Sequence, residues 1–387
     1  MAAYNLGDIR EVPGKDDERT LLFHHFCAAC LKYHANPPRI FSMKILLVHN
    51  APVTAHTYDD AARVLCWLAK ELKATGHEVT LLAKQGSKCD FATLLTLEEK
   101  KPLEVQIPVD TDIVHFHFEP KEAISKPALF TFHGKASEPR SFDRNTVFVS
   151  AQQAREHGGE VFVHYGLDFD HYGPVLLDHR RMWFHFTSSA QWGHRNVRGA
   201  IDLASRAGTR LHVLGGTRFN LREGRITISP SVRFHGHLSA GGRDALLNGS
   251  RGLVFPVVWP EPFGLAVIES LYFGCPVFGT PYGALPELLG RNMMGRKAHS
   301  GTGQMEAFYS DFGCLSVKKS ELLDAIKNAD AYDRSKCQAW VMEHFPIQKM
   351  AREYVHLYEQ VLNGRPLHAE PPLFSGVDGH KALPFGG

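Results

Sequence analysis

The chain has 387 residues, and 43 Lys and Arg residues against 41 Asp and Glu residues give it a formal net charge of +2. At ~150 residues per domain, this length predicts two domains or one large one. Apolar residues make up 44% and charged residues 22% of the chain, which excludes a collagen-like, intrinsically disordered or supercharged protein. The balanced charge gives no electrostatic basis for a nucleic-acid partner.

Residues 1–42 precede the first clear strand, so we expect them to be an N-terminal extension outside the fold. They lack the apolar segment of a secretory signal. The histidines and cysteines at positions 24, 25, 27, 30 and 34 have a spacing that could suit zinc, but without a second Cys-x-x-Cys pair we favour no metal there. The seven cysteines of the whole chain are scattered and odd in number, which predicts reduced thiols in a cytoplasmic protein.

An open α/β domain is predicted for residues 43–178. Residues 44–48 form a short apolar run typical of a buried parallel strand, and residues 59–75 carry apolar side chains at helical spacing. Gly76 ends this helix as a C-cap, and the next strand follows directly, so the segment reads as a βαβ unit. Further strands of this domain are expected at 112–118, 128–133 and 146–149.

The same alternation starts again in residues 179–345. Strands are expected at 182–187, 210–216, 232–238, 252–258 and 276–280, and helices at 196–208, 243–247 and 264–273. Two successive series of this kind indicate two Rossmann-like domains. Neither series has the Gly-x-Gly-x-x-Gly turn, so a dinucleotide-dependent oxidoreductase lacks its fingerprint.

Helices close the chain, at 319–330, 333–343 and 346–362. The last residues, 365–387, are rich in Pro and Gly and have no sustained period. We expect them to form a loose tail.

The stretch from 252 to 290 contains the most informative residues. An amphipathic helix begins near Gly264, and the free N–H groups of Gly264 and Leu265 at its start would attract a phosphate. Glu261 lies before this helix and Glu269 about two turns inside it, so the two carboxylates could act on different parts of one extended ligand. The alternative is a structural helix with one glutamate at its N-terminus and the other on a solvated face.

This stretch resembles the signature of a known family. The run E-P-F-G-L-x-x-x-E at 261–269 is followed by G-C-P-V at 274–277 and G-A-L-P-E at 283–287. Together they are similar to the signature of retaining GT-B glycosyltransferases, in particular glycosyltransferase family 4. Other segments that resemble the family lie at 76–83, 112–118, 129–134, 163–174, 196–204 and 344–362.

The resemblance implies a GT-B architecture, in which two Rossmann-like domains face each other across a cleft. Residues 43–178 would bind the acceptor, residues 179–345 would bind the nucleotide-sugar, and the helix in 346–364 would cross back to the first domain. Sugar transfer would proceed with retention, without a metal or a resident cofactor, from a donor such as a UDP- or GDP-sugar. The acceptor would be a sugar, a lipid-linked molecule or another small molecule.

Roles for the donor-binding residues follow from the same resemblance. Glu269 would hold the ribose hydroxyls, and Glu261 would lie near the donor sugar. The amides of Gly264 and Leu265 would face the sugar and the phosphate. Arg198 matches the family's lysine before glycine, and we expect it to neutralise the diphosphate.

His133 is expected to be catalytic, together with Glu261. It follows a strand at the carboxyl edge of the first sheet, where its neutral imidazole could contact the transferred sugar or the acceptor. His115 and His117 alternate along one strand and share a face, and we expect them to pack or to line the cleft without a metal. No apolar run approaches the ~20 residues of a spanning helix, so any membrane contact would be peripheral.

Two departures from the family pattern leave alternatives open. Residues 49–62 lack the Gly-Gly pair that would let the backbone approach the diphosphate. No arginine directly follows Ser188 or Ser189, so Arg195 or His194 could substitute from a longer loop, and we expect Arg195 to bind the donor. One alternative is a nucleotide-sugar hydrolase or epimerase on the same fold. The other is a non-catalytic relative that binds a nucleotide or a glycan.

Overall fold

The computed structural model describes residues 42–54, 59–187, 195–217, 219–220, 225–226, 229–290, 307–376 and 382–386. The chain divides into two units, Met1–Ser42 and Met43–Gly387. The zinc-like spacing of the first unit lies outside the described residues, as do Ser188 and Ser189. The fold described below is that of the second unit.

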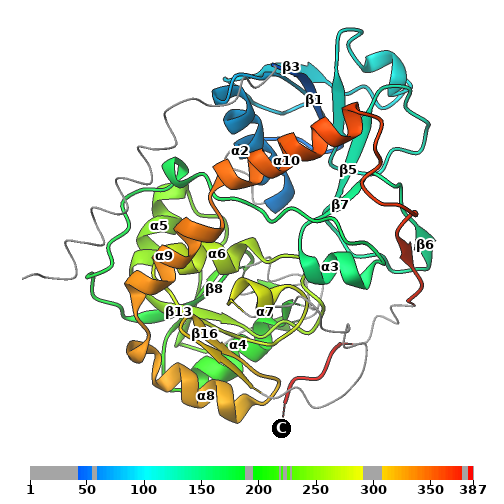
Figure 1. The fold of residues 1–387 in the computed structure, drawn as a ribbon. Coiled ribbons are helices and arrows are strands. Elements are labelled where there is room, and N and C mark those ends of the chain that lie inside the picture. The colour runs from blue at the N-terminus through cyan, green and yellow to red at the C-terminus, as the bar shows by residue number, and fades with distance from the viewer. Residues whose placement is uncertain are drawn as a thin grey trace, which may run out of the picture. The chain divides into compact units, whose positions relative to one another are not determined.

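A six-stranded sheet forms the first domain, with the strand order β3-β2-β1-β4-β5-β7 and only parallel pairs (Figure 1). Its strands are β1 (Lys44–His49), β2 (Glu78–Ala83), β3 (Thr93–Thr96), β4 (Ile113–Phe116), β5 (Ala128–Phe132) and β7 (Thr146–Phe148). The order reverses between β1 and β4, which is the place where ligands bind in open α/β sheets.

Two helices of the first domain begin at the carboxyl edge of this sheet. Helix α2 (Asp60–Ala74) follows β1, and its N-cap Asp59 accepts hydrogen bonds from two amides of the first turn. Its predicted apolar stripe packs against β1 and β2, which explains why the helix forms where the spacing indicated. Helix α3 (Ala151–Glu156) follows β7 and is capped by Ser150; this short helix was not among the predicted elements.

The second domain contains a seven-stranded sheet in the order β12-β9-β8-β13-β14-β16-β15, parallel except for the edge strand β15. Its strands are β8 (Trp183–Thr187), β9 (Leu211–Leu214), β12 (Val232–Phe234), β13 (Ser250–Phe255), β14 (Val277–Gly279), β15 (Phe308–Ser310) and β16 (Gly313–Leu315). Its helices are α4 (Val197–Arg206), α5 (Ala240–Asn248), α6 (Leu265–Tyr272) and α7 (Leu285–Leu288), and β10 (Phe219–Asn220) pairs with β11 (Arg225–Ile226). Both sheets follow the order of a Rossmann domain, so the predicted fold class is confirmed.

Three further helices follow the second sheet: α8 (Lys319–Lys327), α9 (Arg334–His344) and α10 (Ile347–Leu362). Helix α10 runs from the second domain to the first, where it lies along α2 (Figure 1). Its Tyr358 hydroxyl lies 2.8 Å from Nδ1 of His115, and its Tyr354 hydroxyl lies 2.9 Å from Oγ1 of Thr131. The last helix is therefore part of the core of the first domain.

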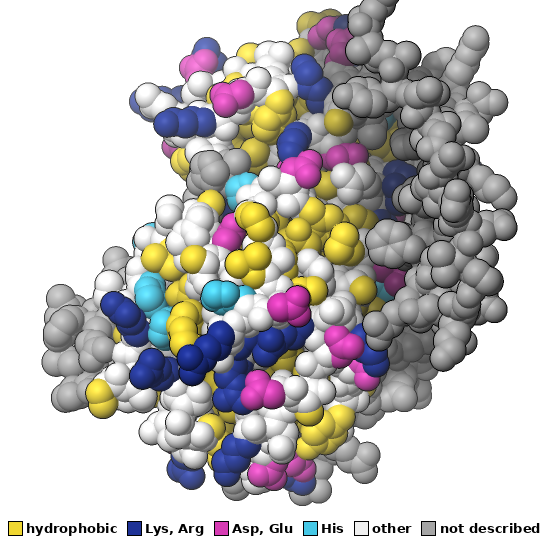
Figure 2. Space-filling model, turned by 90° about the vertical axis from the view of Figure 1, so that its left-hand side faces the viewer, with side chains coloured by type: hydrophobic (Ala, Val, Ile, Leu, Met, Phe, Trp, Pro, Cys, Tyr) yellow, Lys and Arg dark blue, Asp and Glu magenta, His cyan; other side chains and the backbone are white. Residues whose placement is uncertain are grey.

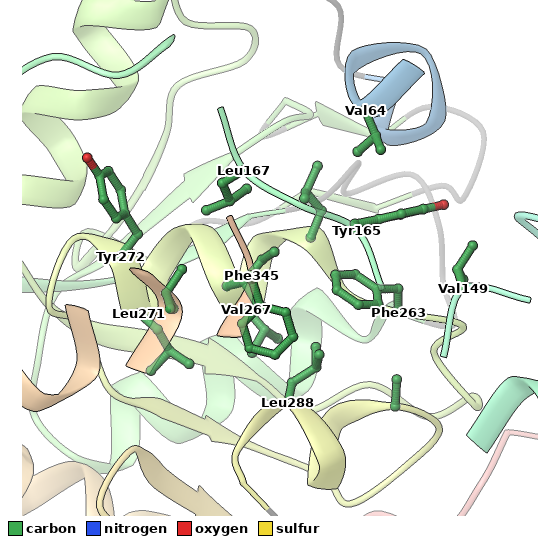
Figure 3. Packing of buried hydrophobic residues seen from close by; sticks show 14 of the residues in the cluster. Val64, Val149, Tyr165, Leu167, Phe263, Val267, Leu271, Tyr272, Leu288 and Phe345 are labelled. Atoms are coloured by element: carbon green, nitrogen blue, oxygen red, sulfur yellow. The ribbon is translucent and has the colours of Figure 1, made fainter. Parts of the chain in front are cut away.

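A buried apolar cluster runs through both domains. Figure 3 shows three of its members together: Val64 on α2, Tyr165 in the connecting segment and Phe263 in the loop before α6. The rings of Tyr165 and Phe263 lie 4.7 Å apart between centroids. Apolar packing therefore holds the start of α6 close to the first domain.

The surface carries charge of both signs. On the face shown in Figure 2, Lys and Arg side chains gather over the second domain, with Asp and Glu side chains among them. This distribution agrees with the small net charge of the chain.

The prediction of a loose tail for 365–387 is wrong for the part of the tail that the structure describes. The ring of His368 bonds through Nε2 to the carbonyl of Thr146, 2.8 Å away. Strand β17 (Leu373–Phe374) pairs antiparallel with β6 (Arg140–Ser141). The side chains of Leu367, His368 and Phe374 are buried, so a few separate contacts and one strand pairing can hold a segment that shows no periodic pattern.

Phe374→Ala should lower the free energy of unfolding by about 3 kcal/mol, because it removes a ring buried against Phe142 and Phe148. Its neighbour Leu373 is 59% exposed, so Leu373→Ala should change that free energy by less than about 0.5 kcal/mol. Denaturant unfolding of both variants measures the difference. Equal stability of Phe374→Ala and the parent would show that the tail does not pack.

Candidate functional site

A cleft of about 980 Å³ lies at the carboxyl edges of both sheets. The first domain contributes the start of α2, with Arg63, and the two residues after β5, His133 and Gly134. The second domain contributes the ends of β8 and β9, the segment from β12 into α5, and the loop before α6. Loops after several strands thus converge on one space, which is the usual position of a ligand in α/β proteins.

Gly264 is the N-cap of helix α6 and lines the cleft. Gly264 has φ +99° and ψ 62°, a left-handed conformation that a residue with a Cβ adopts only with strain. Within the described residues, neither the Gly264 amide nor the Leu265 amide donates a hydrogen bond. The side chain of Leu265 is fully buried behind them, so only its backbone could meet a ligand.

The loop before α6 is held from beneath by Gly283. A Cβ on Gly283 would lie 2.1 Å from the carbonyl oxygen of Glu261, and the residue has φ +62°. The amide of the next residue, Ala284, donates to that same carbonyl at 2.9 Å. From the first domain, Ser150 donates to the carbonyl of Pro262 at 2.7 Å. These contacts fix the backbone that carries Glu261.

Glu261 is buried, with 3% of its surface exposed, and both carboxylate oxygens have partners. Trp259 donates from its indole nitrogen to Oε2 at 2.9 Å, and Arg195 donates to Oε1 at 3.3 Å. Burial raises the pKa of Glu261 above its ordinary value, and Arg195 opposes this shift. The carboxylate is thus oriented by one neutral and one charged donor.

Glu269 lies at the centre of a denser network. Arg63 donates to both of its oxygens, at 2.9 and 3.1 Å, and Tyr172 donates to Oε1 at 2.8 Å. Arg243 approaches the same oxygen at 3.3 Å. Burial alone would raise the pKa of Glu269, but the two arginines and the hydrogen bonds hold it at about 2. This carboxylate is ionised at neutral pH.

His133 sits on the opposite wall of the cleft in a chain of neutral hydrogen-bonding groups. Its Nδ1 lies 2.6 Å from the hydroxyl of Tyr165, and its Nε2 lies 2.9 Å from Nδ1 of His117. Burial lowers the pKa of His133 to about 3, so the ring is neutral at pH 7. His115 is fully buried between Thr131 and α10, as a packing residue would be.

The structure brings together most of the residues that the sequence singled out. Residues His133, Arg195, Glu261, Gly264 and Glu269 all line the same cleft. Arg198 does not: it lies on the first turn of α4 with an exposed side chain, outside the lining of the cleft. Asn196 caps that helix by accepting from the Gly199 amide at 3.0 Å.

Sequence reasoning missed Arg63, Tyr172, Arg243 and Trp259. Trp259 lies two residues before Glu261, so its position in the signature loop was a usable signal. Tyr172 lies in the segment 163–174 that resembles the family, but its partner is far along the chain. Arg63 and Arg243 gave no signal, because each looks like an ordinary basic residue of an amphipathic helix.

Two possible features are absent from the part of the chain that the structure describes. No group of three or more His, Cys, Asp or Glu side chains there is arranged to hold a metal ion. Across those same residues, every helix is too short or too polar to span a bilayer.

Comparison with known proteins shows similarity in sequence over part of the chain and in fold over most of it. Residues 184–309 match the family model described as glycosyl transferases group 1. No curated protein sequence matches the chain.

Solved structures of similar fold cover most of the chain. AviGT4, a glycosyltransferase involved in avilamycin A biosynthesis, is 19% identical with a TM-score of 0.66, over 83% of this chain and 98% of that protein. The catalytic domain of starch synthase IV from Arabidopsis thaliana is 13% identical with a TM-score of 0.60, over 84% of this chain and 100% of that domain. HepE from Anabaena is 14% identical with a TM-score of 0.56, over 82% of this chain and 99% of that protein. At these identities the likeness shows a shared fold, that of the GT-B glycosyltransferases.

Gly283→Ala should destabilise the protein more than Gly208→Ala does. Both glycines have nearly the same positive φ, +62° and +65°, so both variants incur the left-handed strain of about 1–2 kcal/mol. Only Gly283 touches the Glu261 backbone, whereas a Cβ at Gly208 meets nothing within 4 Å. Thermal unfolding of the two variants isolates the contact, and equal losses would show that Gly283 does not support the loop.

The free energy of unfolding should fall as the pH drops from about 5 towards 2, because Glu269 has a folded pKa of about 2 against ~4.3 when unfolded. The folded state binds fewer protons at this site, so its stabilisation is complete above the unfolded pKa and is lost towards the folded one. Glu269→Gln should flatten this slope.

Glu261→Gln is the control, because its effect on the pH dependence of stability should have the opposite sign to that of Glu269→Gln. Burial raises the pKa of Glu261, so the folded state binds more protons there and this site lowers stability as the pH rises. Replacing it should therefore change the slope in the reverse direction. Denaturant titrations at several pH values measure both, and identical slopes for Glu269→Gln and the parent would contradict the ion-pair account.

Proposed function

Because the second domain of this chain belongs to the glycosyl transferases group 1 family and the described part of the chain has the GT-B fold, we propose that this glycosyltransferase takes its sugar from a nucleoside diphosphate donor and transfers it with retention of anomeric configuration. The observation that carries the proposal is the placement of Glu261 and Glu269. The two carboxylates lie on one wall of the cleft, on either side of the unbonded Gly264 and Leu265 amides.

Each part of an extended donor has a counterpart on this wall. Glu269 can accept hydrogen bonds from the two vicinal hydroxyls of a ribose. The amides at the start of α6 offer donors to phosphate, and the helix dipole has the favourable sign. Glu261 lies towards the sugar. The family resemblance suggested UDP- or GDP-sugars, and among similar folds HepE has been solved with UDP and glucose and starch synthase IV with ADP and acarbose.

Arg195 is the better candidate for the phosphate role that the sequence gave to Arg198. The Arg195 guanidinium lies in the cleft lining, 3.3 Å from Glu261, whereas the Arg198 side chain is exposed outside that lining. A guanidinium can bind phosphate oxygens through two donors at once. We therefore assign Arg195 to the diphosphate.

Departure of a nucleoside diphosphate builds positive charge at the anomeric carbon and negative charge on the leaving phosphate. A site for this reaction needs donors and dipoles on the phosphate side more than a strong base. The Glu261 carboxylate can offset the positive charge, and the neutral ring of His133 can donate to or accept from a sugar hydroxyl. Attack from the face that the leaving group vacates would retain the configuration.

The acceptor would enter from the first domain. The polar side chains that line that side of the cleft include two carboxylates, two imidazoles, one guanidinium and one phenol: Asp59, Asp60, His133, His171, Arg63 and Tyr165. Such groups recognise hydroxyls, which suits a sugar or a polyol acceptor, free or lipid-linked. No resident metal or cofactor is required by this arrangement.

Glu269→Gln should weaken binding of the donor nucleotide by about 1–3 kcal/mol, because the amide replaces a charged acceptor. Glu261→Gln should lower kcat more than it weakens donor binding, because its carboxylate acts on charge that develops only in the transition state. Calorimetric titration with UDP, GDP and ADP, and initial rates with the matching nucleotide-sugars, measure both effects.

Glu98→Gln is the control, because Glu98 lies in an exposed ion pair with Lys101 away from the cleft. If both cleft variants bind and turn over like this control, the two-glutamate site is wrong. If the parent consumes donor without any acceptor, the protein is a hydrolase or an epimerase. If it binds nucleotide but transfers no sugar across an acceptor panel, it is a non-catalytic relative.

A further inference from the structure

Arg63 of the first domain is paired with Glu269, the carboxylate that the proposed function assigns to the ribose. It lies in the first turns of α2, 206 positions before Glu269 in the chain, and donates to both oxygens of that residue. Its side chain is only 7% exposed, and that of Glu269 only 5%. The two domains are therefore joined, inside the cleft, by a buried bidentate ion pair.

The cleft supplies its own counter-anions. Among the described residues that line it, each of the three arginines is paired with a carboxylate of the protein. Arg195 is paired with Glu261, and Arg63 and Arg243 are both paired with Glu269. Arg63 also reaches Asp60, one turn earlier in α2, at 3.2 Å. A diphosphate that binds to these arginines therefore competes with the carboxylates that already pair with them.

Binding of a ribose at Glu269 would force Arg63 to change partners. Vicinal hydroxyls would take the two carboxylate oxygens that Arg63 now holds. A guanidinium buried to this extent and left without a full counter-charge is strongly unfavourable. The same ligand brings two negatively charged phosphate groups into the cleft that Arg63 lines.

We propose that Arg63 is a donor-binding residue supplied by the first domain, which exchanges Glu269 for the diphosphate when the nucleotide binds. This inference rests on the proposed function, since it takes a nucleoside diphosphate as the ligand. The same inference accounts for the missing Gly-Gly pair in 49–62. In the family pattern those glycines bring the backbone to the diphosphate, whereas in this chain the guanidinium of Arg63 follows that segment directly.

The surroundings of Arg63 suit a side chain that changes partners without moving far. The next residue, Val64, anchors this turn of α2 in the buried cluster (Figure 3). The guanidinium lies 5.4 Å from the ring centre of Trp67, which supports its stem and its charge. Its Nε is buried and has no hydrogen-bond partner among the described residues, so the pairing with Glu269 leaves one of its donors unsatisfied.

The test compares charged and uncharged ligands on the full chain. UDP, GDP and ADP are titrated first, and the tightest binder, its nucleoside and inorganic pyrophosphate are then titrated into Arg63→Ala, Arg63→Lys and the parent. Arg251→Ala is the matched control, because Arg251 pairs with Asp330 at 2.8 Å at the other end of β13. Thermal unfolding verifies that each variant is folded.

Arg63→Ala should bind the nucleoside diphosphate and pyrophosphate about 10- to 100-fold more weakly than the parent. It should bind the nucleoside equally well or more tightly, because one competitor for Glu269 is gone. Arg63→Lys, which keeps the charge but loses the two-pronged geometry, should lie between the parent and Arg63→Ala. Arg251→Ala should behave like the parent with all three ligands.

Other outcomes overturn the inference. If diphosphate and nucleoside weaken by the same factor, Arg63 only supports the fold of the cleft. If both bind more tightly, Arg63 only blocks Glu269. If UDP, GDP and ADP all fail to bind the parent, the proposed function fails, and the exchange then stands or falls on whether pyrophosphate binds the parent and weakens in Arg63→Ala.

Discussion

A buried carboxylate must be paired, and in this protein the pairing of Glu269 organises the site. Glu269 lies on α6 in the second domain, and its partners come from α2, from the connecting segment and from α5. Four parts of the chain therefore depend on one charged group. Arg63 and Arg243 balance the charge of Glu269 in a largely buried position, and Tyr172 adds a neutral hydrogen bond, so charge balance as well as apolar packing sets the geometry of the cleft.

The family signature has a second, structural role that its resemblance alone does not reveal. Gly283 supports the backbone of Glu261, and Glu287 accepts from the amides of Ala151 and Gln152 at 3.1 Å, so it caps a helix of the other domain. The segment G-A-L-P-E thus holds the loop before α6 and ties it to α3. The first run of the signature, at 261–269, thus lines the cleft, and the run at 283–287 supports its backbone.

The fold could be predicted from the sequence because its elements have local signals. Helix α2 begins after the cap Asp59 and ends before Gly76, and both sheets show as apolar runs between helices. The packed tail could not be predicted, because it is held by a few separate contacts, those of His368, of Phe374 and of one strand pairing, that leave no periodic pattern. The partner of Glu269 could not be predicted either, since an arginine 206 positions away has no local mark that separates it from a surface residue.

In this account Arg63 pairs with Glu269 only in the absence of nucleotide; when a nucleotide binds, its ribose takes the place of Arg63 on Glu269, and Arg63 moves to the diphosphate. A crystal structure of the protein with the tightest-binding nucleoside diphosphate measures this directly. The account predicts ribose hydroxyls within hydrogen-bonding distance of both Glu269 oxygens, and the Arg63 guanidinium on a phosphate oxygen. A complex in which Arg63 still donates to both oxygens of Glu269, with the nucleotide bound elsewhere, would contradict it.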